Sequence, residues 1–163
     1  MSLGLYLHIP YCFSKCRYCD FYSHPGERGV PEAYVDALVR ELDRFAPEAP
    51  LQPDTLYFGG GTPSLLRPEQ AKRLIDAARP MPGAEITLEA NPETVTEESL
   101  AGFREAGVNR ISFGVQSARD TQLRTLGRPH TAKQARAAFA AARRAGFANI
   151  SGDIMLALPH YTE

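Results

Sequence analysis

The sequence carries no surplus of positive charge and no long apolar run. Its 163 residues hold eighteen Lys and Arg against nineteen Asp and Glu, a formal net charge of -1. This balance argues against a surface that binds nucleic acid and against a polybasic membrane anchor. No stretch approaches the length of a membrane span, and the start has neither a basic leader nor a signal-peptide run. We therefore expect one globular domain over residues 1–163, located in the cytoplasm.

Cysteine is scarce, and its placement is informative. The three cysteines, Cys12, Cys16 and Cys19, form the pattern C-x3-C-x2-C. An odd number at such close spacing excludes a disulfide framework and fits a reducing compartment. Thiolates hold iron–sulfur clusters, and four are usual for a cubane of four irons. Three thiolates would leave one iron open to chelate an amine and a carboxylate, as an open zinc position accepts water.

The same three thiols allow a second interpretation. A Cys3His zinc site could be completed by His8 or by His24. Structural zinc sites more often pair two C-x2-C knuckles, and this sequence has no second knuckle. The spacing therefore favours iron and sulfide over zinc.

Apolar periodicity predicts five strands that alternate with helices. A junction recurs, since residues 104–112 resemble residues 143–151, each joining a helix through a glycine to a buried strand. The order favours a parallel sheet covered by helices, either an open doubly wound sheet or a barrel. The aromatic residues Tyr34, Phe45, Phe103 and Phe139 lie at helical spacing and are expected in the core. The predicted strands are 3–9, 55–58, 85–90, 108–115 and 150–158, and the predicted helices are 31–45, 68–79, 96–107, 120–126 and 131–146.

Polar residues and glycines follow the predicted strands at their carboxyl ends, where α/β folds place their chemistry. The run from Gly59 to Gly61 lacks the lysine of a phosphate loop, so it is either a tight turn or a place where a ligand approaches bare backbone. Glu89, Gln116 and Asp153 each interrupt an apolar segment, and together they indicate one shared pocket. Arg128 is either a candidate contact for a carboxylate or a solvated arginine. Among the histidines, His8 is expected to be a core or supporting group. The other three are expected to be solvated: His24, His130 and His160.

In combination, these motifs resemble the oxygen-independent coproporphyrinogen oxidase family of radical SAM proteins. The resemblance runs from residue 3 to the end of the chain and implies a partial TIM-like (β/α)6 barrel. The family's barrel has six strands, so the chain is expected to be cut after the fifth strand, with an exposed strand edge and poor solubility in isolation. The motifs that carry the resemblance are Tyr6-Leu7-His8-Ile9-Pro10-Tyr11-Cys12, the cysteine loop, Tyr57–Ser64, Glu89-Ala90-Asn91-Pro92, Ser112–Ser117 and Asp153-Ile154-Met155.

The resemblance also implies roles for individual residues. Cys12, Cys16 and Cys19 would ligate a [4Fe-4S] cluster. Further residues would contact S-adenosylmethionine (SAM) on the open iron or lie around that SAM or a second one. The expected SAM contacts are Tyr6, Gly60 and Glu89, and the surrounding positions are Tyr18, Gly61, Thr62, Gln116, Arg128 and Asp153.

One position separates two branches of the family. Decarboxylating members carry a further cysteine two residues after the third cluster cysteine, and this sequence has Phe21 there. The Cys-Asp-Phe form is similar to the haem chaperone branch, which implies haem as a ligand, a recipient haemoprotein and an electron donor as partners. The alternatives are SAM-dependent decarboxylation of coproporphyrinogen III in porphyrin biosynthesis and, from another class, a zinc-stabilised binding module.

Overall fold

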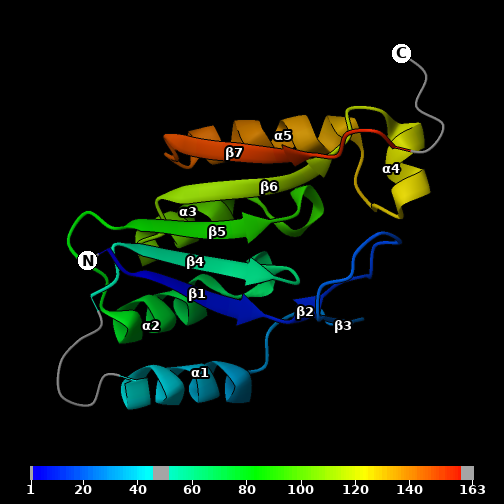
Figure 1. Ribbon diagram of the computed structural model, residues 1–163. Helices are drawn as coiled ribbons and strands as arrows, with labels where there is room; N and C mark the ends of the chain where they lie inside the picture. Colours follow the sequence, from blue (N-terminus) through cyan, green and yellow to red (C-terminus); the bar gives the residue numbers. More distant parts are fainter. Residues whose placement is uncertain (1, 46–51, 159–163) are drawn as a thin grey trace.

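The computed structural model describes residues 2–45 and 52–158. Its centre is a five-stranded sheet of order β1-β4-β5-β6-β7 in which every neighbouring pair is parallel. All five arrows point the same way in Figure 1, so their carboxyl ends share one edge. The strands are β1 Gly4–Ile9, β4 Thr55–Gly60, β5 Glu85–Ala90, β6 Arg110–Gln116 and β7 Asn149–Ile154.

All the described helices except α4 form one layer. Helix α1 packs on α2, α2 on α3, and α3 on α5, in the same order as the strands they follow. A strand order that never reverses, joined by crossovers of one hand, puts these four helices on the same face, whereas α4 lies beyond the strand ends (Figure 1). This arrangement excludes the doubly wound alternative and confirms a partial (β/α) barrel. The helices are α1 Glu32–Phe45, α2 Pro68–Ala78, α3 Glu97–Ala106, α4 Asp120–Leu126 and α5 Ala132–Arg144.

The core lies between the sheet and this helix layer. Phe58, Leu88 and Phe113 from the central strands are fully buried against side chains such as Leu74 and Phe103 from the helices. Burial of these side chains stabilises the fold by about 1.5–3 kcal/mol each. Phe45 is an exception to the predicted core, because it is the last residue of α1 and is 74% exposed.

The two helix–strand junctions that recur in the sequence have the same backbone conformation. Gly107 and Gly146 have φ of 114° and 90°, a left-handed conformation that glycine adopts without strain. After each glycine the chain enters a fully buried position, Val108 or Phe147. The amides of these two residues bond back to Phe103 and Ala142, each at 3.0 Å. The two junctions therefore set successive strands in equivalent positions.

The fifth strand is shorter than predicted. The pattern predicted residues 150–158, whereas β7 ends at Ile154. Its neighbour β6 ends at Gln116, where φ is 65° and the register shifts, so the ladder has no further partner. Among the described residues β7 pairs only with β6, and Ile154 at its end is 67% exposed. This is the exposed edge that the sequence predicted; poor solubility stays a prediction.

Short elements follow the carboxyl ends of the first three strands. Strand β2 (Tyr11–Cys12) pairs with β3 (His24–Pro25), and the 3-10 turns η1 (Pro63–Leu65) and η2 (Pro92–Thr94) each begin at a proline. None of the helices described here is both long enough and apolar enough to cross a membrane. His160 lies outside the described residues.

Candidate functional site

The three cysteines lie on a loop that is closed at its base, residues 12–23, here called the cysteine loop. Its two ends are held by the β2–β3 pairing and by the His24 amide, which donates to Pro10 O at 2.6 Å. The Gly26 amide donates to Phe13 O at 3.2 Å, and a turn inside the loop bonds Cys19 N to Cys16 O at 3.2 Å. These backbone bonds fix the entry and exit of the loop at the edge where the strands end.

The far side of the cysteine loop packs on the end of α4. The Arg17 amide donates to Leu126 O at 3.1 Å. Gly127, with φ of 73°, leaves room for the Arg17 side chain, because a Cβ there would lie 3.2 Å from Arg17 Cγ. In Figure 1, α4 and the cysteine loop lie at the same edge of the sheet, beyond the tips of the arrows. The loop is therefore held from two sides, by the sheet edge and by α4.

The glycine run after β4 lets the cysteine loop approach. A Cβ on Gly61 would lie 2.6 Å from Tyr11 O, closer than real contacts allow, and 3.0 Å from Cys12 Sγ, a tight contact. Gly60 has φ of 112°, and its amide donates to Glu89 Oε2 at 3.3 Å. The run is thus a place of close backbone approach, and the segment that approaches it is the cysteine loop. The approach of a ligand to this backbone stays a prediction.

One cleft gathers the predicted site residues at this edge, with the exception of Tyr6. The exposed ring of Phe21 and the side chain of Asn91, which the sequence interpretation did not select, also line it. The predicted residues in its lining are Cys12, Cys16, Tyr18, Cys19, Gly60, Gly61, Thr62, Glu89, Gln116, Arg128 and Asp153.

Tyr6 stands beside the cleft and is half-exposed. Its ring stacks on Tyr57 with the centroids 6.0 Å apart, and Tyr57 donates its hydroxyl hydrogen to Glu89 Oε1 at 2.8 Å. Burial raises the pKa of Glu89, and the nearby Asp153 carboxylate adds to this, against the bonds from Tyr57 and the Gly60 amide. Ionisation of Glu89 therefore costs free energy, and a ligand that is cationic or donates hydrogen bonds would lower that cost.

Burial also raises the pKa of Tyr18, which lines the same cleft, to about 12.

His8 belongs to this wall and not to the metal ligands. Its Nε2 lies 3.0 Å from Tyr22 O, and its Nδ1 lies 3.3 Å from the Tyr6 hydroxyl. A carbonyl only accepts, so Nε2 carries a hydrogen toward Tyr22 O, and both ring nitrogens are engaged by neighbouring groups. In residues 2–45 and 52–158, no three His, Cys, Asp or Glu side chains are grouped closely enough to hold one metal ion. This holds for the three cysteines under either interpretation, so it does not separate zinc from iron and sulfide; the bonds of His8 are what argue against its use as a fourth ligand.

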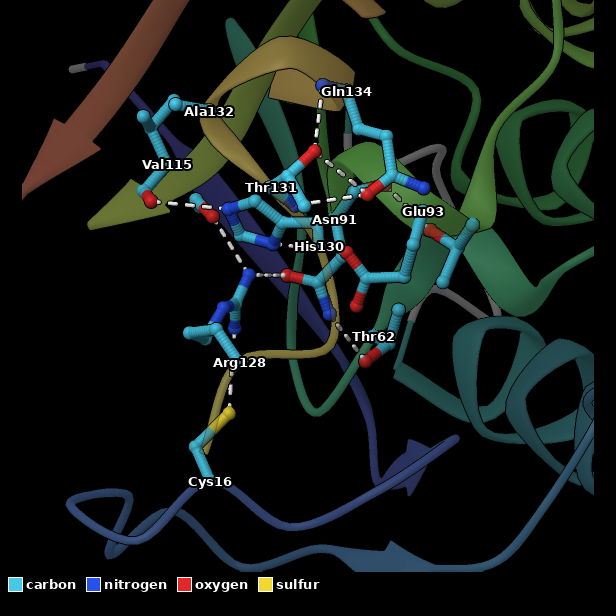
Figure 2. A network of polar contacts seen from close by, with 12 residues as sticks. Cys16, Thr62, Asn91, Glu93, Val115, Arg128, His130, Thr131, Ala132 and Gln134 are labelled. Atoms are coloured by element: carbon cyan, nitrogen blue, oxygen red, sulfur yellow. Dashed lines mark hydrogen bonds and ion pairs between the residues drawn. The ribbon is translucent and has the colours of Figure 1, made fainter. Parts of the chain in front are cut away.

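Arg128 is buried, so the expectation of a solvated arginine is wrong. Its side chain reaches across the cleft, and Nη1 donates to Cys16 Sγ at 3.4 Å. Nη2 donates to Asn91 Oδ1 and to Gly114 O, both at 2.6 Å. On the other side of Asn91, Thr62 donates to Cys12 Sγ at 3.6 Å. We call Thr62, Asn91 and Arg128 the donor network; it is visible in Figure 2.

His130 is also buried, and the prediction that it is solvated is wrong. Its Nδ1 lies 3.1 Å from Glu93 Oε2 and its Nε2 lies 3.1 Å from Val115 O, both drawn in Figure 2. A backbone carbonyl only accepts, so Nε2 carries a hydrogen toward Val115 O. The two bonds of the His130 ring tie the loop that carries Arg128 to η2 and β6. Tertiary contacts alone create this pair, and no local sequence signal indicates it.

The chemistry of the thiols fits a thiolate-bound cluster. All three cysteines are free, Cys12 is buried, and Cys16 and Cys19 are half-buried. Two of the sulfurs receive hydrogen bonds, one of them from a guanidinium, and such bonds stabilise negative charge on sulfur. Burial opposes the charge on Arg128, but the bond to Cys16 leaves the pKa of its guanidinium raised.

Comparison with known proteins agrees with this geometry. The model of the radical SAM superfamily matches residues 6–163. The heme chaperones HemW of Escherichia coli and Bacillus subtilis are 43% and 41% identical over 96% of this chain. The mitochondrial radical S-adenosyl methionine domain-containing protein 1 of Bos taurus is 42% identical over 96% of this chain. The chain spans less than half the length of these relatives, 43%, 43% and 36% respectively.

Solved structures agree as well. Coproporphyrinogen III oxidase (HemN) from Escherichia coli superposes with a TM-score of 0.87 at 32% identity, over 99% of this chain and 38% of its own. HydG, a maturase of the [FeFe]-hydrogenase, shares the fold at a TM-score of 0.69 and 15% identity, over 99% of this chain and 36% of its own. With the cysteine loop, the cleft and the one-layered parallel barrel in place, this chain belongs to the radical SAM superfamily.

Proposed function

We propose that Cys12, Cys16 and Cys19 hold a [4Fe-4S] cluster whose open iron binds SAM. The superfamily implies both groups. The observation that carries the proposal is the placement of three free thiols on one closed loop, at the strand-end edge, facing a cleft with Glu89 in its wall. When bound, the cluster supplies the electron that cleaves SAM.

The residues around the thiols are suited to hold SAM. Gly60 offers bare backbone, and Glu89 offers a carboxylate to hydroxyl or ammonium donors. Tyr6 extends this wall at the rim of the cleft. We assign these three residues to SAM; the assignment of the surrounding positions, to the same SAM or to a second one, is part of the proposal. They are Tyr18, Gly61, Thr62, Gln116, Arg128 and Asp153.

For the whole protein we favour a haem chaperone. The chain is closely related to proteins named heme chaperone HemW, and Phe21 stands where decarboxylating members have a cysteine. Phe21 is 65% exposed in the lining of the cleft and has no atom that could ligate a metal or donate a proton. The proposed partners are haem, a recipient haemoprotein and an electron donor in a reducing compartment such as the cytoplasm.

A second candidate is oxidative decarboxylation of coproporphyrinogen III. The observation in its favour is the likeness to HemN, which covers 99% of this chain. Both candidates share the cluster and SAM, so the core of the site does not discriminate between them. They differ in the fate of the porphyrin, which is therefore the quantity to measure.

The test uses the full-length protein, reconstituted anaerobically with iron and sulfide and then reduced in the presence of SAM and coproporphyrinogen III. We expect a brown protein that binds SAM, forms no vinyl-bearing porphyrin and binds haem. Vinyl product together with 5′-deoxyadenosine would establish the decarboxylase instead. A colourless, zinc-containing protein without SAM affinity would overturn the cluster. The variant C16S should lose the colour, whereas S14A in the same loop should keep it.

A further inference from the structure

A single side-chain amide stands between the groups that donate hydrogen bonds to two of the cysteines. Asn91 Oδ1 lies 2.6 Å from Arg128 Nη2, and Asn91 Nδ2 lies 3.2 Å from Thr62 Oγ1. Beyond these two partners lie the sulfurs of Cys16 and Cys12. Figure 2 shows Arg128 and Thr62 on opposite sides of Asn91. Asn91 follows directly after β5, so the sheet fixes its backbone.

The direction of each hydrogen bond in this network follows from the chemistry of its members. A guanidinium only donates, so it must face the oxygen of Asn91, and the amide nitrogen then faces Thr62. That nitrogen also only donates, so Thr62 Oγ1 accepts from it and keeps its own hydrogen for Cys12 Sγ, 3.6 Å away. Arg128 Nη1 donates to Cys16 Sγ at 3.4 Å. Both ends of the network therefore direct hydrogens at sulfur.

Packing holds the network in this arrangement. Thr62 and Arg128 are 3% and 8% exposed. Both hydrogens of Arg128 Nη2 are used, by Asn91 Oδ1 and by Gly114 O. A Cβ at Gly114 would lie 3.0 Å from Arg128 Nη2 and 3.1 Å from Asn91 Oδ1, so the glycine leaves just the room that the network fills.

We propose that Asn91 is a positioning residue that sets the reduction potential of the cluster, an inference that rests on the proposed cluster at Cys12, Cys16 and Cys19. Reduction adds negative charge to the cluster, and hydrogen bonds to its cysteine sulfurs stabilise that charge and raise the potential. Asn91 touches neither sulfur; it aligns Thr62 and Arg128 so that both of them do. Through the Asn91 amide, the hydrogen bond from Thr62 to Cys12 and the hydrogen bond from Arg128 to Cys16 thus depend on each other.

The experiment is a redox titration of the reconstituted full chain, followed by electron paramagnetic resonance of the reduced cluster, without SAM. In N91L both donors lose their alignment, and the potential becomes more negative. At a fixed solution potential, the ratio of reduced to oxidised cluster should fall about tenfold, the effect of one charge-assisted hydrogen bond. The control R124Q removes an exposed positive charge from α4 and should leave the ratio unchanged.

The variant T62V keeps the volume of Thr62 and removes the hydroxyl that accepts from Asn91 and donates to Cys12, while Arg128 keeps its bonds to Asn91 and Cys16, so it tests the idea even if N91L does not load. It should lower the ratio by a smaller factor, and T62V/N91L should fall less than the two single effects combined. A loaded N91L or T62V with the wild-type potential would overturn the inference alone. A wild-type chain that assembles no cluster would overturn the proposed function, and the inference with it.

Discussion

Two polar networks in this protein use similar residues in opposite surroundings. On the surface, Arg67 and Arg73 from the α2 region bridge to Glu32 and Asp36 on α1. These side chains are about half-exposed, at 45–53%. Beneath the cysteine loop, Thr62, Arg128 and His130 are at most 8% exposed, and the Glu93 side chain is 15% exposed.

The difference in burial changes what each network can do. Water screens the surface pairs, so removing one partner leaves the other solvated. In the buried network a lost partner leaves a charge or donor without compensation, which costs far more. A buried donor can also act on a sulfur with less competition from water than a donor on the open surface. Burial, more than residue type, therefore distinguishes the surface pairs, which contribute little to stability, from the buried groups, which hold the residues around the cysteines in place.

The largest effect is expected from H130A, which removes a fully buried side chain and leaves the Glu93 carboxyl group, 15% exposed, without its partner. We expect a loss of about 3 kcal/mol in the free energy of unfolding, because a largely buried polar group without a partner is costly. Urea denaturation measures this value. The double variant H130A/E93L should recover part of the loss, since it removes the stranded carboxylate. A loss no greater than that of an exposed histidine, or a double variant that loses the sum, would contradict the buried pair.

An intermediate effect is expected for Glu89, which lies in the wall of the cleft and is less exposed than Arg67 and Arg73 of the surface pairs but less buried than His130. Burial raises its pKa above 4.5, so the native state binds the proton more tightly than the unfolded chain. The free energy of unfolding should therefore fall as the pH rises from the unfolded value through the raised native one. Relative to E89Q, the wild type should lose about 1 kcal/mol or less over this window, since the open cleft screens the charge. Urea titrations of both proteins at several pH values check this; a difference that grows in favour of the wild type would refute it.

The smallest effect is expected from R73A in the surface network. Its urea midpoint should match the wild type at moderate salt. Any residual difference should vanish near about 1 M salt, where the Debye length is about 3 Å. A large loss that persists at high salt would show that exposure does not separate the two networks.

The cysteine loop and the strand ends could be predicted from the sequence because both depend on local patterns. Cys12, Cys16 and Cys19 lie close together in the sequence, so they must lie on one loop. Parallel strands bring their carboxyl ends to one edge of the sheet whatever the lengths of the strands. For that reason Glu89, Gln116 and Asp153 were found together in the lining of the cleft. Their roles toward SAM remain predictions.

Other features could not be predicted because they depend on contacts between distant segments. His130 has the sequence surroundings of a loop histidine, yet Glu93 and Val115 enclose it. Phe45 has the spacing of a core residue, but it ends its helix beyond the packed surface. Periodicity reports which side of an element is apolar and does not report what covers it.

The sequence by itself determined the order of strands and helices, the glycine junctions and the thiol triplet, because hydrophobic period, backbone freedom and ligand spacing are local properties. Only the tertiary structure decided that Arg128 is buried against Cys16 and that Asn91 links it to Thr62. Those contacts join residues separated by 112, 37 and 29 positions in the chain. They form only when the completed sheet brings the ends of β4, β5 and β6 beside the cysteine loop.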